Sequence, residues 1–152
     1  MDLEKLKEKL ISIVPTAEFE ENKQFLTAVI PSDKLHSLAK KLKESEDTLF
    51  DYLFCLSAVD WTTHIGVVYH LTSTKLNHNI VLKVKTTDRE NTVFDSVTDV
   101  WKTAEFHERE AFDLMGIKFK NHPDMRRIFL EDDWIGYPLR KDYKDDVNIV
   151  EQ

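Results

Sequence analysis

The run His107-Glu108-Arg109-Glu110 carries side chains that could bind a metal or move a proton. A helix with the pattern HExxH places two histidines one turn apart, where both can bind zinc while the glutamate acts as a base. Position 111 is alanine, so the second histidine is missing, and the next histidine along the chain is His122. A small zinc hydrolase that uses His107, Glu108 and His122 is therefore an alternative that lacks the full zincin pattern.

Other catalytic classes lack the residues on which they depend. Three glycines in the whole chain leave no glycine-rich loop for the phosphates of a nucleotide, a flavin or NAD. No serine or cysteine lies in a nucleophile elbow. The single cysteine, Cys55, lies in an apolar run, where we expect a buried core thiol. One thiol cannot hold an iron–sulfur cluster, which takes about four. We therefore expect no catalytic residue, no metal and no cofactor in this chain.

The bulk composition favours one globular protein domain. The chain has 152 residues and a formal charge of −7, which weighs against nucleic acid as a partner. No apolar run approaches the roughly 20 residues of a membrane-spanning helix. The first fifteen residues lack the pattern of a secretory signal. We expect no direct membrane span, although another protein could hold the chain on a membrane complex.

The spacing of apolar residues predicts an α+β fold. Leu3, Leu6 and Leu10 recur at helical spacing before Pro15, and Ser32 is a suitable cap for a second helix. Runs rich in valine, isoleucine and aromatic residues predict strands. The expected helices are 2–13 and 33–44, and the expected strands are 23–30, 49–61, 66–75 and 79–86. This order predicts a mainly antiparallel sheet of about four strands with helices packed on one face.

A further apolar stripe runs from Val97 to Met115 at helical spacing and contains one acid, Glu108. If one helix covers this stripe, the Glu108 carboxylate faces the core, where a charge needs a partner. Arg126, Arg127 or a group on another chain could supply one. A helix break near Phe106 would instead leave Glu108 in solvent. On the same helix, Arg109 and Asp113 are four residues apart and could pair.

Regular periodicity fades after Gly116, a plausible helix stop. The remaining segment is rich in proline, glycine, aromatic residues and arginine. Of these, tryptophan, tyrosine and arginine are common at the energetic centres of protein interfaces. We divide the chain into an α+β domain over 1–119 and an extended C-terminal arm over 120–152. Two interpretations stay open: an arm that docks on a partner, and a long loop wrapped on its own domain.

The stretch from Glu108 to Asp142 closely resembles the signature of the 30-kDa subunit family of respiratory complex I, whose bacterial members are the C subunit of NADH-quinone oxidoreductase. The resemblance also covers 99–101, whereas before about residue 48 it is one of layout only. Lys144 stands where family members often have proline. The residues that carry the resemblance are Glu108, Arg109, Glu110, Asp113, Gly116, His122, Pro123, Arg126, Arg127, Gly136, Pro138, Leu139, Arg140, Lys141 and Asp142.

The resemblance implies a non-catalytic subunit in the peripheral arm of a proton-translocating NADH:quinone oxidoreductase. It implies docking on the 49-kDa subunit (the D subunit) and neighbouring peripheral-arm subunits, on the cytoplasmic side of the inner (cell) membrane. NADH, FMN, iron–sulfur clusters and quinone would be bound by other subunits. Relatives in membrane-bound hydrogenases and in oxidoreductases with other electron donors leave an equivalent role there as the alternative.

The resemblance and the composition of the arm together predict a set of partner-binding residues. These are Glu108, Arg109, Glu110, Asp113, His122, Pro123, Arg126, Arg127, Trp134, Gly136, Tyr137, Pro138, Arg140, Lys141 and Asp142.

Overall fold

A five-stranded sheet forms the centre of the protein in a computed structural model that describes residues 2–21 and 24–144. The strand order is β1-β2-β5-β4-β3. The strands are β1 (Glu18–Glu20), β2 (Leu26–Val29), β3 (Tyr52–Asp60), β4 (Ile65–Ser73) and β5 (His78–Thr86). Strands β3, β4 and β5 pair antiparallel, and β2 joins β5 in parallel. The predicted α+β class with a mainly antiparallel sheet is confirmed.

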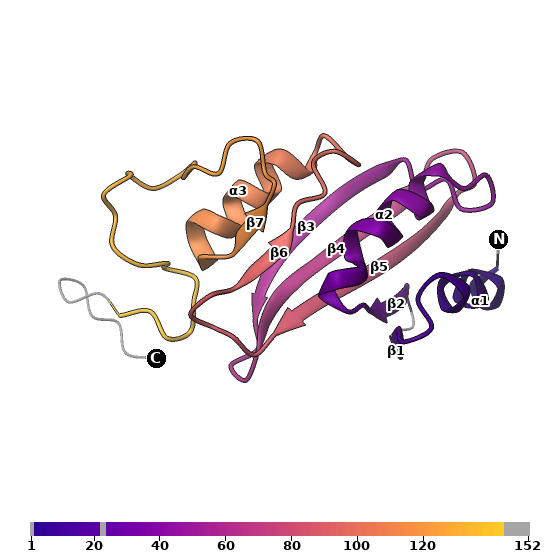
Figure 1. Ribbon diagram of the computed structural model, residues 1–152, viewed down its shortest axis with the longest axis horizontal. Helices are drawn as coiled ribbons and strands as arrows, with labels where there is room; N and C mark the ends of the chain where they lie inside the picture. The colour runs from indigo at the N-terminus through magenta and orange to yellow at the C-terminus, as the bar shows by residue number, and fades with distance from the viewer. Residues whose placement is uncertain (1, 22–23, 145–152) are drawn as a thin grey trace.

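The helices and a second, smaller sheet complete the fold (Figure 1). The helices are α1 (Leu3–Ile13), α2 (Leu35–Glu44, preceded by a 3₁₀ turn at Ser32–Lys34) and α3 (Ala104–Met115). Strands β6 (Val93–Asp95) and β7 (Lys118–Lys120) pair in parallel and flank α3 in sequence. The sequence did not predict β1 or β6, because three residues are too few to display an alternating pattern.

One continuous core joins the sheet to the helices. Alternate residues of β4, among them Tyr69, are buried, and they share the core cluster with Leu38 of α2 and Ala104 and Ala111 of α3. Full burial of a leucine side chain such as Leu38 contributes roughly 1.5–3 kcal/mol to the free energy of folding. In Figure 1, α2 lies across the sheet and α3 lies beside β3. Leu38 and Leu42 of α2 and Ala104 and Ala111 of α3 are buried in the core that they share with the sheet.

A β-bulge in β3 corrects the expectation for Cys55. The pairing register with β4 shifts between Leu53 and Cys55. Because of this shift Leu53 and Leu56 are both buried in the core, whereas Cys55 is only half-buried. Its thiol lies 3.4 Å from the Ser57 hydroxyl. A bulge breaks the strict alternation of side chains, which an apolar run alone does not reveal.

The stripe that begins at Val97 is not helical throughout, and α3 begins only at Ala104. Residues 97–101 instead form a tight turn, in which the amides of Val100 and Trp101 both donate to the carbonyl of Val97. The indole N–H of Trp101 donates to the Phe50 carbonyl at 2.9 Å, so the ring is buried without helical backbone. At the other end Gly116 terminates the helix with φ 72°, as predicted.

Replacing Gly66 with alanine should destabilise the sheet. The added Cβ would meet the Val84 carbonyl oxygen and lie 2.9 Å from the Cα of Lys85. Both are backbone atoms of β5 that cannot turn aside. We expect the free energy of unfolding to fall by about 1–3 kcal/mol, as in other overpacked sites, measured by urea denaturation. Asn79→Ala, at an exposed position of β5, is the control; an unchanged midpoint for Gly66→Ala would contradict the β4–β5 register.

Candidate functional site

Asp113, in the last turn of α3, fastens the start of the irregular C-terminal segment. Its side chain is fully buried. One carboxylate oxygen accepts the backbone N–H groups of Ile128 (3.1 Å), Phe129 (2.7 Å) and Leu130 (3.1 Å). Burial alone would raise the pKa of this carboxyl, but these hydrogen bonds and one from Arg127 outweigh it and lower the pKa. The charge is thus stable in the interior only while the arm is in place.

Arg127 ties two parts of the arm to each other and to α3. Its guanidinium donates to the carbonyl and to a carboxylate oxygen of Asp113, both at 3.2 Å. A second nitrogen donates to the carbonyls of Trp134 (3.2 Å) and Gly136 (3.1 Å). The planar fork of an arginine can serve several acceptors at once, which a lysine cannot do with the same geometry. Residues 127–130 and 134–136 are therefore held side by side.

Arg109 of α3 also binds the backbone of the arm. Its Nε and Nη2 atoms donate to the carbonyls of Arg126 and Arg127, each at 3.1 Å. Arg109 and Asp113 are spaced so that they could pair, but Asp113 forms its ion pair with Arg127 instead. Both side chains are used on the arm, because its irregular backbone has few internal partners and the helix supplies them.

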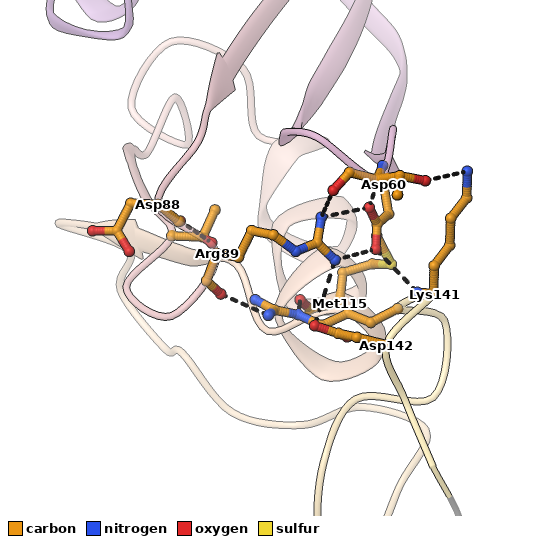
Figure 2. A network of polar contacts seen from close by, with 9 residues as sticks. Asp60, Asp88, Arg89, Met115, Lys141 and Asp142 are labelled. Atoms are coloured by element: carbon orange, nitrogen blue, oxygen red, sulfur yellow. Dashed lines mark hydrogen bonds and ion pairs between the residues drawn. The ribbon is translucent and has the colours of Figure 1, made fainter.

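A second buried acid, Asp60, binds the arm at Lys141 (Figure 2). It lies at the end of β3 and its side chain is 2% exposed. Its carboxylate accepts two bonds from the Arg89 guanidinium, at 2.7 and 2.6 Å, and the backbone N–H groups of Thr62 (2.8 Å) and Lys141 (3.0 Å). The bond from Arg89 holds the pKa of Asp60 far below its usual range. Asp142 approaches the same guanidinium at 3.5 Å.

We call Asp60, Arg89, Arg140 and the Lys141 amide the clasp. Arg140 adds two more contacts to this group. Its Nε donates to the Met115 carbonyl and its Nη1 to the Arg89 carbonyl, both at 2.6 Å. The Leu139 amide donates to the Leu114 carbonyl at 3.0 Å, so the arm returns to the end of α3. Sequence reasoning missed Asp60 and Arg89. The only sequence signal for Asp60 was its position as an acid directly after an apolar strand. No sequence signal marked Arg89.

Glu108 is fully buried within an unbroken α3, which decides between the two interpretations of this residue. Its carboxylate accepts the Ser96 hydroxyl at 2.7 Å and the Val97 N–H at 2.9 Å. Arg126 and Arg127, two of the possible partners, do not pair with Glu108, and no ion pair reaches Glu108 within the part of the chain that the structure describes. Burial, reinforced by the nearby charge of Asp99, raises its pKa from 4.5 to about 7.

Tyr137 and Gly136 support the clasp. Two guanidinium groups lie near the Tyr137 ring, that of Arg127 at 5.1 Å and that of Arg140 at 5.7 Å from its centroid. The same ring packs on Gly116, where a Cβ would approach it within 2.6 Å. Gly136 has φ 87°, a conformation that disfavours other residues, and its carbonyl accepts from Arg127.

The remaining predicted residues are spread over the arm and the surface of α3. Arg126 is largely exposed and forms a bidentate pair with its neighbour Asp124. Lys141 reaches the Thr62 hydroxyl at 3.3 Å. Glu110 lines a groove between α3 and β3, and Trp134, Pro123 and Pro138 lie on exposed or half-buried backbone. Whether any of these residues contacts a partner stays a prediction, and residues 145–152 of the predicted arm lie outside the described residues.

The zinc alternative finds no assembled ligand set. His122 Nδ1 accepts the N–H of Asp124 at 2.9 Å, so its Nε2 carries the proton and donates to the Glu105 carbonyl at 3.0 Å. Glu108 is bonded to Ser96 and Val97. In residues 2–21 and 24–144, no three histidine, cysteine or acidic side chains are placed to hold a metal ion. None of the helices described there is long and apolar enough to cross a membrane.

Comparisons with known proteins agree on one protein family. A family model described as "Respiratory-chain NADH dehydrogenase, 30 Kd subunit" matches residues 28–147. The C subunit of NADH-quinone oxidoreductase from Moorella thermoacetica is 41% identical over 139 residues, which cover 90% of this chain and 92% of that protein. The C/D subunit of NADH-quinone oxidoreductase from Phocaeicola vulgatus is 51% identical over 120 residues, which cover 78% of this chain but only 23% of that protein.

A solved structure has the same fold. It belongs to the membrane-bound sulfane sulfur reductase, an archaeal respiratory membrane complex. The match has a TM-score of 0.78 and 27% sequence identity, and it covers 95% of this chain and 86% of that chain. None of these similarities gives any support to a zinc hydrolase.

Glu108 should make the stability of the domain depend on pH. The folded protein keeps a proton on Glu108 that the unfolded chain releases, so stability should fall as the pH rises from 4.5 to about 7. The total loss is about 3 kcal/mol by the conversion of pKa shift to free energy. In Glu108→Gln the amide can donate to Ser96 and its carbonyl can accept from Val97, so this variant should lose the slope and exceed the wild type above neutral pH.

Urea denaturation at a series of pH values measures this effect. Glu105→Gln, an acid-to-amide change on the same helix, should keep the wild-type pH dependence. The assignment to Glu108 would be wrong if Glu108→Gln and the wild type lost stability in parallel.

Removing the charge of Asp113 should loosen the arm while the sheet stays folded. In Asp113→Asn the side chain cannot accept three amides and an arginine together, and charged hydrogen bonds of this kind contribute roughly 1.5–3 kcal/mol each. Hydrogen exchange of the amides of Ile128, Phe129 and Leu130 should become at least about tenfold faster, which corresponds to ~1.4 kcal/mol. Asp124→Asn, which breaks only an exposed pair with Arg126, is the matched control and should leave those amides protected.

Proposed function

The chain belongs to the 30-kDa subunit family of the respiratory-chain NADH dehydrogenase, and from this membership we propose that it is a peripheral-arm subunit of a proton-translocating NADH:quinone oxidoreductase. The family match over residues 28–147 is the observation that carries the proposal, since it spans both the sheet and the clasped arm. In this role the chain catalyses nothing itself. It supports electron transfer from NADH to quinone as a structural part of the complex.

The proposed direct partner is the 49-kDa subunit, also called the D subunit, together with neighbouring subunits of the peripheral arm. Some relatives are named as C/D subunits, and the chain spans only 23% of the length of the first of them. A protein in which the two parts form one chain keeps them together, which supports direct contact between separate C and D subunits. NADH, FMN, the iron–sulfur clusters and quinone would be bound by other subunits. The complex would hold this chain on the cytoplasmic side of the inner (cell) membrane.

A second candidate is the equivalent subunit of a complex that takes electrons from another donor, including a membrane-bound hydrogenase. The likeness to a structure from the archaeal sulfane sulfur reductase supports it, because the fold is shared across complexes with different chemistry. A host strain that lacks this chain separates the two candidates. Loss of NADH-dependent quinone reduction in its membranes supports the first. Intact NADH oxidation with loss of another donor's activity supports the second.

Weakening the clasp should impair assembly. Arg140→Ala removes two hydrogen bonds that hold the arm to the end of α3 and to Arg89. The tagged variant should recover about tenfold less of the oxidoreductase from solubilised membranes, equivalent to ~1.4 kcal/mol. Lys40→Ala, at an exposed position of α2, is the control and should recover the wild-type amount. If wild-type protein recovers none of the 49-kDa subunit, the proposed partner is wrong.

A further inference from the structure

Glu108 has no contact with solvent, yet the proton that it gains or loses must come from solvent. The residue is fully buried within α3. Burial raises the pKa of its carboxyl to about 7, so both protonation states are populated near neutral pH. A buried acid can exchange its proton in two ways: the structure opens locally, or hydrogen-bonded side chains pass the proton inward. The contacts of Glu108 favour the second way.

The Ser96 hydroxyl connects Glu108 to a second hydroxyl. Ser96 Oγ lies 2.7 Å from the Glu108 carboxylate and 2.9 Å from Thr98 Oγ1, and it accepts the backbone N–H of Thr98 at 3.2 Å. A serine hydroxyl has one proton and two acceptor positions. The backbone N–H takes one acceptor position, which leaves one acceptor position and one proton for Glu108 and Thr98 Oγ1. These two hydrogen bonds must therefore run in the same direction along the chain of oxygens.

The two possible directions correspond to the two charge states of Glu108. The Val97 N–H occupies Oε1, so an added proton resides on Oε2, the oxygen that faces Ser96. When Glu108 is ionised, Thr98 donates to Ser96 and Ser96 donates to the carboxylate. When Glu108 is protonated, its O–H donates to Ser96 and Ser96 donates to Thr98. One proton taken up by Thr98 Oγ1 thus shifts each hydroxyl proton inward by one oxygen, and both hydroxyls end neutral.

Thr98 brings this chain of oxygens to the surface. Its side chain is half-buried and lines an open groove together with Asp99, Lys43 and Lys102. Asp99 pairs with His36 of α2 at 2.8 Å, and Lys43 of α2 donates to a backbone carbonyl of the same turn. Water or a buffer acid in this groove can supply the proton that Thr98 passes on.

The other acids and the tyrosine around Glu108 influence its charge without extending the chain of oxygens. Asp99 adds to the effect of burial on the pKa of Glu108. Burial, then the charges of Glu108 and of Asp95 on β6, raise the pKa of Tyr69 on β4 well above its usual value, so Tyr69 keeps its proton while Glu108 titrates. The Tyr69 hydroxyl has no hydrogen-bond partner among residues 2–21 and 24–144. No second path starts there.

We propose that Ser96 and Thr98 form a proton-transfer path between the groove and Glu108. The path carries a proton from water or a buffer acid to Glu108 Oε2, and back, while the turn at 96–101 and α3 stay folded. The buried charge beside the turn then follows the pH at the groove, although no part of the domain opens. The path does not depend on which complex holds the chain.

Infrared spectroscopy after a sudden release of protons tests the path in the full-length chain. A photolysed proton cage supplies the protons, and the C=O band of neutral Glu108, identified by its absence in Glu108→Gln, shows when a proton arrives. Thr98→Val removes the hydroxyl from a side chain of similar shape. Proton arrival should become at least about tenfold slower, a barrier increase of ~1.4 kcal/mol. Thr98→Ser, which keeps a hydroxyl, should retain the wild-type rate.

The equilibrium titration separates this role from a structural one. The pH of half-protonation should stay near its wild-type value in Thr98→Val, because the carboxyl keeps its bonds from Ser96 and the Val97 N–H. Slow exchange at an unchanged midpoint is not the result of a loosened fold. Thr103→Val is the matched control, since it removes from the same groove a hydroxyl that bonds the Leu53 carbonyl, and it should keep the wild-type rate.

Two results would overturn the proposal. One is proton arrival in Thr98→Val as fast as in the wild type. The other is arrival in the wild type no faster than the opening of the turn, which hydrogen exchange of the Val97 amide measures because that amide bonds Glu108. Thermal unfolding shows whether each variant is folded. If Thr98→Val does not fold, Thr98→Ala takes its place with the same expected slowing.

Discussion

The buried carboxylate of Asp113 is the constraint on which the path of the C-terminal arm depends. A carboxylate without solvent must be neutralised or fully hydrogen-bonded, and here three successive amides and an arginine do this. Three amides can converge on one oxygen only if the backbone curls around it. The position of Asp113 therefore sets the path of residues 128–130, and Arg127, fixed by the same carboxylate, sets the path of 134–136.

Three buried acids illustrate how their partners decide their charge. Asp60 and Asp113 each have an arginine as well as backbone amides, and the pKa of each is lowered despite burial. Glu108 has only neutral donors, the Ser96 hydroxyl and the Val97 amide, and burial raises its pKa to about 7. The first two act as permanent anions that bind the arm. The third is a hydrogen-bonding group whose charge is costly, and it shapes the turn before α3.

Sequence patterns predicted the parts of the fold that depend on local periodicity. The spacing of Leu3, Leu6 and Leu10 predicted α1, the valine-rich runs predicted β4 and β5, and Gly116 predicted the end of α3. The turn at Val97 escaped prediction because its buried side chains keep helical spacing while its amide bonds Glu108. The bulge beside Cys55 and the acceptors of Arg109 and Arg127 depend on contacts between distant segments, which periodicity does not encode.

The bond between Asp60 and the Lys141 amide joins positions 81 residues apart. Contacts between such distant positions close large loops, and we expect them to form after the local pairing of β3, β4 and β5. The arm follows the sheet in the sequence, so the ribosome synthesises the residues of the sheet before those of the arm. A nascent or truncated chain that lacks Arg127 and Lys141 thus carries a sheet without a fastened arm. The loop around Ile135 can therefore acquire its held shape only after residues 127–141 have been synthesised.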